Sequence, residues 1–236
     1  MIESPNHSEN KRFWKRKKEV RPQEILKAAT ELFVEQGFSA TKVAMVAKKA
    51  GVQPGTIYVY YENKEALFKA VIHAAMDPVL QYSNDFLKQY TGSSKNLLFE
   101  LTHQWWKLME SEACAGIPKL VTAESKNFPD LTRFYMDQVL VHAKRIVEGV
   151  LEYGIQKNDF FVENLDISAR IMMHSLHEIT VYAHSFDSLA DEKLDIELYL
   201  DQLASFFYKS LSNPHPVDRP LKGPEIQALN TEENHQ

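Results

Sequence analysis

Apolar residues recur at spacings of three and four along most of this 236-residue chain, from Arg21 to Ser212, and alternating runs of β-branched residues are few. Such spacing places apolar side chains on one face of an α-helix, whereas a half-buried strand needs strict alternation. The pattern therefore predicts an all-α fold without strands. The expected helices cover about residues 22–36, 41–51, 53–60, 64–77, 79–90, 95–111, 117–127, 129–156, 165–186 and 194–211.

Glycine and proline mark several expected helix ends. Pro22 suits the first turn of the first helix, and Gly37 is a C-terminal stop. The next two helices are short and are separated by a few residues that include Gly51, which is a helix-turn-helix pattern. Asp77-Pro78 predicts a break or a kink between two longer helices.

The composition excludes several classes of protein. With 44% apolar and 25% charged residues the chain is expected to be globular, and no stretch approaches the ~20 apolar residues of a bilayer-spanning helix. The polar N-terminus is unlike a signal peptide, so we expect a cytoplasmic protein without membrane contact. The single cysteine, Cys114, excludes an intrachain disulfide and is expected in a loop between helices.

The net charge of −5 is distributed unevenly. Residues 1–72 contain 13 Lys and Arg against 8 Asp and Glu, whereas residues 73–236 contain 14 against 24. A basic front end suggests a polyanion partner. We expect a basic arm at 1–20, a helix-turn-helix domain at 21–72, a larger helical domain at 73–212 and a disordered tail at 213–236, where four of 24 residues are proline and none is aromatic.

The third expected helix carries the groups that a major-groove reading helix needs. Pro54 and Gly55 allow close approach of the backbone, Val59 offers an apolar contact to a thymine methyl, and flanking polar groups suit phosphates. The alternative is a small helical subdomain with a solvated basic face. The predicted DNA contacts are Thr41, Lys42, Gln53, Pro54, Gly55, Thr56, Tyr58, Val59, Tyr60 and Lys64.

A family resemblance covers about residues 21–72. It rests on Ala28-Ala29, Leu32-Phe33, Gly37-Phe38, Thr41, Val46-Ala47, Ala50-Gly51-Val52, Gly55-Thr56-Ile57-Tyr58, Tyr61, Asn63-Lys64-Glu65 and Leu67. In this order and spacing the segment resembles the DNA-binding domain of TetR-family transcriptional regulators. The resemblance implies an all-α homodimer that binds a palindromic double-stranded DNA operator, with a divergent C-terminal domain for a small effector and dimerisation, most often as a repressor.

The segment 11–18 departs from the minimal family pattern, with six cations and two aromatic residues in eight positions. Basic arms can follow the minor groove or the phosphate backbone and add salt-dependent affinity. The alternative is a solvated tail whose aromatic residues pack on the first helix.

The larger domain contains the candidates for effector binding. Ligand sites are mostly apolar with a few polar groups, so we expect a largely apolar or aromatic effector. For each candidate singly, a core or surface position is the alternative. The candidates are His103, Trp106, Glu124, Tyr135, His142, Met173 and His177. Apolar stripes on the last two expected helices predict a homodimer interface.

Catalysis finds little support in the sequence. His174, His177 and Glu178 could share one helix face, but the further carboxylates of a di-iron bundle are missing, as are phosphate-loop and hydrolase motifs. We therefore expect no enzyme, metal or cofactor. The alternatives are a metal-dependent helical-bundle enzyme and a family member that binds DNA without an effector.

Overall fold

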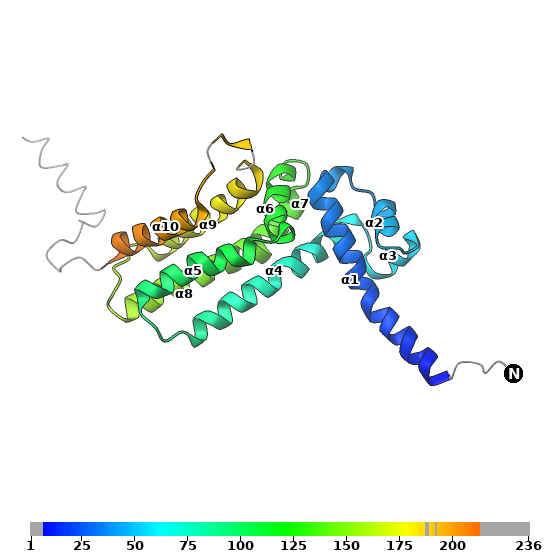
Figure 1. Cartoon of the computed structure of the whole chain (residues 1–236), viewed down its shortest axis with the longest axis horizontal. Helices are drawn as coiled ribbons and strands as arrows, with labels where there is room; N and C mark the ends of the chain where they lie inside the picture. Colours follow the sequence, from blue (N-terminus) through cyan, green and yellow to red (C-terminus); the bar gives the residue numbers. More distant parts are fainter. Residues whose placement is uncertain (1–6, 187–188, 192, 213–236) are drawn as a thin grey trace, which may run out of the picture.

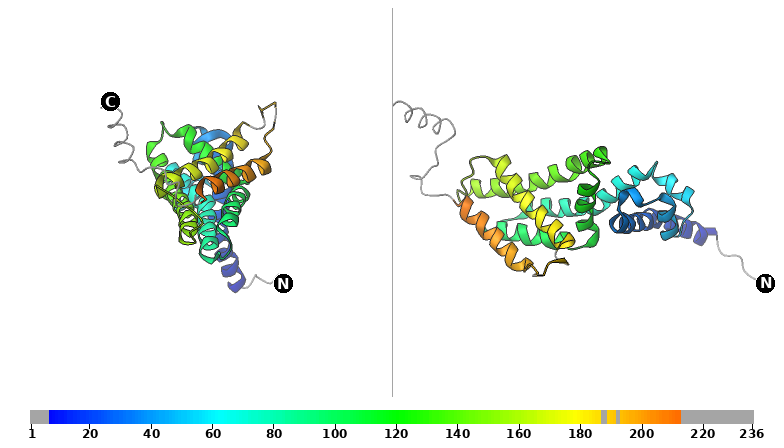
Figure 2. Two further views of the ribbon diagram at one scale, coloured as in Figure 1. Left: turned by 90° about the vertical axis from the view of Figure 1, so that its left-hand side faces the viewer. Right: turned by 90° about the horizontal axis from the view of Figure 1, so that it is seen from above.

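The computed structural model describes residues 7–186, 189–191 and 193–212. Figure 1 shows α1, α2 and α3 at one end of an elongated molecule and a bundle of longer helices at the other, and the right-hand view of Figure 2 shows the same division from above. The helices are α1 (His7–Ala40), α2 (Val43–Lys49), α3 (Pro54–Tyr60), α4 (Lys64–Gln89), α5 (Ser94–Met109), α6 (Glu112–Glu124), α7 (Pro129–Tyr135), the π-helical segment η1 (Met136–Leu140), α8 (Val141–Gln156), α9 (Leu165–Ser185) and α10 (Ile196–Leu211).

The all-α prediction is confirmed. Over the described residues, extended pairing is limited to an isolated antiparallel bridge between Phe160 and Ser212. No described helix is long and apolar enough to cross a membrane. The tail predicted at 213–236 lies outside the described residues.

Glycine ends the helices of the N-terminal module as the sequence predicts. Gly37 has φ +85° and interrupts α1, and Gly51 has φ +65° in the turn between α2 and α3. Both values lie in the left-handed region, which costs glycine little because it lacks a Cβ atom. The turns place α2 against α1 and α3 against α2, and Phe33, Val46 and Ile57 are buried in one shared cluster.

Three predicted helix boundaries were wrong. α1 begins at His7 and includes Pro22, because Lys, Arg and Glu upstream are good helix formers and one lost backbone hydrogen bond does not end the helix. α4 continues through Pro78, where Met76 and Val79 anchor it by burial.

The third error concerns α6, which begins at Glu112 rather than near residue 117. The side chain of Ser111 caps this helix by accepting a hydrogen bond from the backbone N–H of Cys114 at 3.2 Å. Cys114 is therefore a buried helical residue and not a loop thiol, and its Sγ lies 3.6 Å from the carbonyl oxygen of Ala75.

The helix expected at 129–156 is continuous but contains the π-helical turn η1. A π-turn inserts one extra residue and rotates the side chains that follow, so α8 presents a different face from the one that a uniform 3.6-residue period predicts. Val139 within η1 and Ala143 in α8 are both buried.

The buried residues form two apolar clusters. One extends from α1, α2 and α3 through the first half of α4 into α6 and α7, and the other fills the bundle of α5, α8, α9 and α10. α5 packs against α4, α6, α8, α9 and α10 and is therefore the central helix of the bundle. The N-terminal module and α6 therefore share one core.

Candidate nucleic-acid interface and ligand pocket

α3 packs through one residue and exposes most of the others. Ile57 is buried, whereas Val59 is 77% exposed and Tyr58 is 55% exposed. Gln53 is the exposed N-cap of α3, and its side chain makes no capping hydrogen bond. The start of α3 thus presents polar and apolar groups that its own fold does not use, as a helix that reads the major groove requires.

The other candidates lie along α3 and at the start of α2. Pro54 and Gly55 are exposed, and a Cβ atom added at Gly55 would meet nothing within 4 Å. Thr56 and Tyr60 are half-buried. Lys42 is exposed at the N-cap of α2, close to the free N–H groups that favour an anion.

Thr41 has a different role from the predicted one. Its side chain is fully buried, and its hydroxyl donates to the carbonyl oxygens of Leu32 at 3.1 Å and Gly37 at 2.8 Å. The side chain therefore cannot reach a phosphate. It fixes the end of α1, and sequence alone did not distinguish this buried threonine from an exposed one.

Lys64 is also engaged within the protein. Its Nζ donates to the carbonyl oxygens of Phe38 at 2.9 Å and Ser39 at 3.5 Å, and it lies 4.3 Å from the centroid of the Phe38 ring. At the start of α4 it binds the segment that joins α1 to α2.

Glu124, predicted as an effector ligand, binds the same segment from α6. One carboxylate oxygen accepts from the backbone N–H of Ser39 and the other from its hydroxyl, each at 3.0 Å. Asn127 donates to the second oxygen at 3.0 Å. These bonds outweigh the small desolvation of the group and hold the pKa of Glu124 below its ordinary value, with a contribution from the Lys64 charge.

An apolar pocket lies among α4, α5, α8 and α9. The cavity itself is about 20 Å³, close to the space that one water molecule needs, so a larger ligand enters only if the lining side chains move apart. Among its polar residues, Ser83 donates its hydroxyl to the carbonyl oxygen of Val79 at 2.9 Å, and Gln104 lies on α5. The lining residues are Tyr82, Ser83, Phe86, Leu87, Leu97, Leu101, Gln104, Trp105, Ala143, Ile146, Val147, Val150, Met173 and Leu176.

Of the predicted effector residues only Met173 lines this pocket. His103 lies on the outer side of α5, where its Nε2 is 3.3 Å from a carboxylate oxygen of Asp201 on α10. His142 is exposed at the start of α8. Tyr135 is buried in the cluster shared with the N-terminal module, and burial raises the pKa of its hydroxyl.

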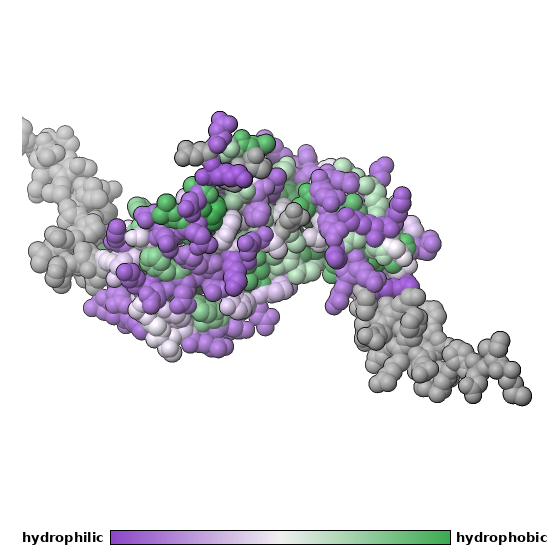
Figure 3. All heavy atoms as spheres, in the orientation of Figure 1, coloured by the Kyte–Doolittle hydropathy of each residue, from purple (hydrophilic) through white to green (hydrophobic). Residues whose placement is uncertain are grey.

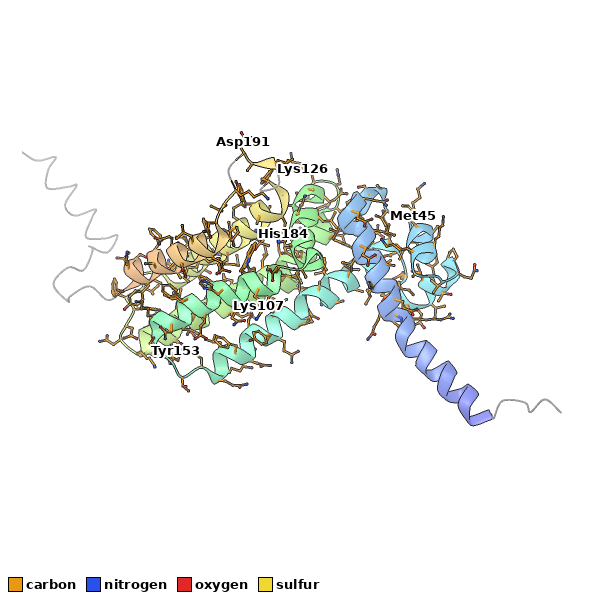
Figure 4. The ribbon with its side chains drawn as sticks, in the orientation of Figure 1. Met45, Lys107, Lys126, Tyr153, His184 and Asp191 are labelled. Atoms are coloured by element: carbon orange, nitrogen blue, oxygen red, sulfur yellow. The ribbon has the colours of Figure 1, made fainter. Side chains whose placement is uncertain are left out.

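The last two candidates, Trp106 and His177, lie on α5 and α9. The ring of Trp106 packs on that of His184 at a centroid distance of 5.9 Å, and Figure 4 labels His184 close to α6. Burial lowers the pKa of His177 on α9. No group of three His, Cys, Asp or Glu side chains able to hold a metal occurs among the described residues.

The sequence missed most of the pocket. Trp105, for example, donates its indole N–H to the carbonyl oxygen of Leu176 at 3.2 Å and also lines the pocket. The only signal was the surplus of apolar residues around α5. Ser39 was missed as a binding partner because Glu124 is 85 residues away in sequence.

Comparisons with known proteins agree with this arrangement. Residues 25–71 match the family model for bacterial regulatory proteins of the tetR family. The chain is 26% identical over 199 residues to the fatty acid metabolism regulator protein of Bacillus subtilis (strain 168), covering 83% of this chain and 99% of that protein. It is 32% identical over 148 residues to the uncharacterized HTH-type transcriptional regulator YdeS of the same organism, covering 62% of this chain and 70% of YdeS.

A solved structure has the same fold. The transcriptional regulator FadR from Bacillus subtilis in complex with stearoyl-CoA superposes with a TM-score of 0.62 at 20% sequence identity. The match covers 82% of this chain and 99% of that one.

Proposed function

Because the chain belongs to the TetR family of bacterial regulatory proteins and is a ligand-responsive transcriptional regulator, we propose that it is a homodimeric repressor in the cytoplasm. In this proposal α3 reads a palindromic operator in the major groove. A largely apolar effector binds in the larger helical domain, here called the body, and thereby releases the protein from DNA. Because effector binding only shifts a population, the effector must bind the DNA-incompetent state more tightly, by about 1.4 kcal/mol for each tenfold loss of operator affinity.

The exposed start of α3 carries the proposal for DNA. Gln53 and Val59 project from a helix whose only fully buried side chain is Ile57, and neither contributes to the core. We assign base reading to Gln53, Gly55 and Val59. We assign phosphate contacts to Lys42, Thr56, Tyr58 and Tyr60. Thr41 and Lys64 are not assigned to DNA, because their side chains form hydrogen bonds within the protein.

The apolar pocket supports the choice of effector. Its lining is almost entirely aliphatic and aromatic, so a long hydrocarbon chain gains by leaving water there. A structural neighbour holds stearoyl-CoA. We propose a long-chain fatty acyl compound as the effector of this chain, with Gln104 as the polar group that orients it.

The outer faces of α9 and α10 support the homodimer. Ile167 and Ile171 are one turn apart on α9, Leu198 and Phe206 lie on α10, and at least half of each side chain is exposed. Figure 3 shows hydrophobic side chains gathered on the surface over these helices. Two such helix pairs related by a two-fold axis would cover the faces as a four-helix bundle and place the two α3 helices about 34–36 Å apart.

Fluorescence anisotropy tests the DNA proposal. The full-length protein is titrated onto labelled DNA from upstream of its own gene and onto duplexes enriched from a random pool, with scrambled duplexes as the control. Saturable binding at least a hundredfold tighter than the control is expected, with affinity that falls steeply with salt. Binding no better than the control on both DNA sources would contradict the proposal.

A second titration tests the effector. Stearoyl-CoA added to the preformed complex is expected to release the DNA, and free coenzyme A is expected to leave it bound. Release by both compounds, or by neither, would contradict an acyl effector while leaving the DNA result intact.

A further inference from the structure

Residues 37–41, here called the α1–α2 junction, connect the helix that supports the N-terminal module to the helices that face DNA. The junction is internally fixed, because the Thr41 hydroxyl binds the carbonyl oxygens of Leu32 and Gly37. The Phe38 ring packs between the rings of Phe68 at 5.1 Å and Phe128 at 4.6 Å between centroids. A displacement of the junction is therefore expected to carry α2 and α3 with it.

Two side chains from different helices hold opposite ends of the same junction residue. Lys64 at the start of α4 donates to the carbonyl oxygen of Ser39, and Glu124 at the end of α6 accepts from its N–H and hydroxyl. Asn127 holds the Glu124 carboxylate in place. The position of Ser39 thus depends on the position of α4 relative to α6.

The two helices differ in their relation to the pocket. α4 contributes Tyr82, Ser83, Phe86 and Leu87 to the lining, whereas α6 contributes no lining residue. α6 is instead packed tightly on α1, since a Cβ atom added at Gly116 would lie 2.6 Å from the methyl carbons of Val34. A ligand in the pocket therefore contacts α4 directly, whereas it reaches α6 only through other helices.

We propose that Glu124 is a positioning residue for DNA binding, whose carboxylate holds the helix-turn-helix at a fixed orientation to the ligand-binding body. A ligand that moves α4 relative to α6 must strain either the Lys64 bond or the Glu124 bonds to Ser39, because the two helices hold that residue from opposite ends. Pocket occupancy is thereby tied to the orientation of α3. The proposal rests on the proposed function and adds the contact through which the body acts on the DNA-reading helices.

Three variants of the full chain test it. Glu124→Ala removes all the bonds to Ser39, Glu124→Gln keeps an acceptor but removes the charge, and Ser39→Ala removes only the hydroxyl bond. Glu152→Ala is the matched control, because Glu152 is exposed on α8 and its replacement changes the net charge equally.

The first readout is hydrogen exchange of the Ser39 amide, the group that donates to Glu124. Exchange is expected to accelerate at least tenfold in Glu124→Ala, less in Glu124→Gln, and to stay at the wild-type rate in Glu152→Ala. The second readout is operator affinity, which is expected to fall about tenfold in Glu124→Ala, within the usual range of coupling between sites. Its salt slope should not change, because Glu124 touches no phosphate.

Unchanged exchange in Glu124→Ala, or faster exchange with operator affinity within twofold of wild type, would overturn the proposal. If Glu124→Ala does not fold, Ser39→Ala still decides, with a smaller change expected in both readouts. Wild-type protein that binds no DNA specifically contradicts the proposed function instead, because that result is shared by the wild type and all variants.

Discussion

The ammonium group of Lys64 donates to the carbonyl oxygen of Phe38 at 2.9 Å and lies 4.3 Å from the ring centroid of the same residue. One ammonium group thus forms a hydrogen bond to a carbonyl oxygen at the end of α1 and a cation–π contact with an aromatic ring. In sequence the same lysine is typical of a phosphate contact. The two roles predict different results in solution.

Replacement of Lys64 by Met keeps the aliphatic stem and removes the ammonium group. We expect the free energy of unfolding to fall by about 1–2 kcal/mol, because charged hydrogen bonds to backbone carbonyls are lost. Urea denaturation measures this change. The salt slope of operator binding should match wild type. Lys42→Met, at an exposed lysine, should reduce it by about 1.8, which is about 0.9 for each of the two Lys42 residues of the proposed dimer, and leave stability unchanged. A reduced slope in Lys64→Met would restore the phosphate role.

Replacement of Val59 by Ser should alter sequence preference and not stability. The side chain is 77% exposed, so the free energy of unfolding should change by less than about 0.5 kcal/mol. Loss of an apolar contact to a thymine methyl should cost about 1 kcal/mol of discrimination at one base pair. Anisotropy on the operator and on its single-base variants measures this. A uniform loss across all duplexes would argue that Val59 does not read a base.

Replacement of Met173 by Trp should fill the pocket and abolish the response to stearoyl-CoA. The added volume is expected to cost about 1–3 kcal/mol of stability, so thermal unfolding is followed alongside. Operator affinity should stay at the wild-type value, because Met173 is remote from α3. His142→Trp is the control, since His142 is exposed outside the lining. Full release of DNA from the Met173 variant would exclude this pocket as the effector site.

Replacement of Phe206 by Glu should place two charges in the proposed interface of α9 and α10. Sedimentation at micromolar concentration should then show monomers, and operator affinity should fall because the half-sites are no longer bound together. Ile155→Glu is the matched control, since Ile155 is 41% exposed and lies on α8, which is not part of the proposed interface. A monomeric control, or a dimeric Phe206 variant, would contradict the assigned interface.

The Glu124 contact predicts a dependence of stability on pH. Hydrogen bonds from Asn127 and Ser39 hold the pKa of Glu124 below its ordinary 4.5. The stabilisation is therefore fully present above pH 4.5 and is lost as pH falls through the lower pKa of the folded state. Urea titrations should show the advantage of wild type over Glu124→Gln shrinking below pH 4.5. A difference that stays constant into acid would contradict the ionised contact.

The helices of the N-terminal module could be predicted from sequence because glycine positions and helical periodicity are local features. Gly37 and Gly51 stand where the backbone enters the left-handed region, and Ile57 is buried where the helical period requires it. Side-chain roles were less readable. Thr41 and Lys42 are adjacent polar residues, but one is fully buried and the other exposed.

The body was predictable as helices but not as a site. Polar residues were chosen as effector ligands because chemistry favours them, whereas the pocket is lined mainly by aliphatic and aromatic side chains that periodicity assigns to any core. Its position depends on which faces of α4, α5, α8 and α9 oppose one another. The π-helical turn η1 rotates the apolar face of α8 relative to the preceding helix, and the spacing of apolar residues in the sequence does not reveal this rotation.

The cluster that joins α1–α3 to α6 and α7 limits how such a regulator can be recombined. Phe128 and Leu131 from the body close the same core as Phe33 and Phe38. A chimera that joins residues 21–72 to the ligand-binding domain of another regulator would expose these aromatic side chains to water. The loss of folding stability would be about 1.5–3 kcal/mol for each large side chain. A stable chimera must therefore include α6 and α7 as well as residues 21–72. The smallest part of this protein that can be transferred with its core intact is discontinuous in sequence.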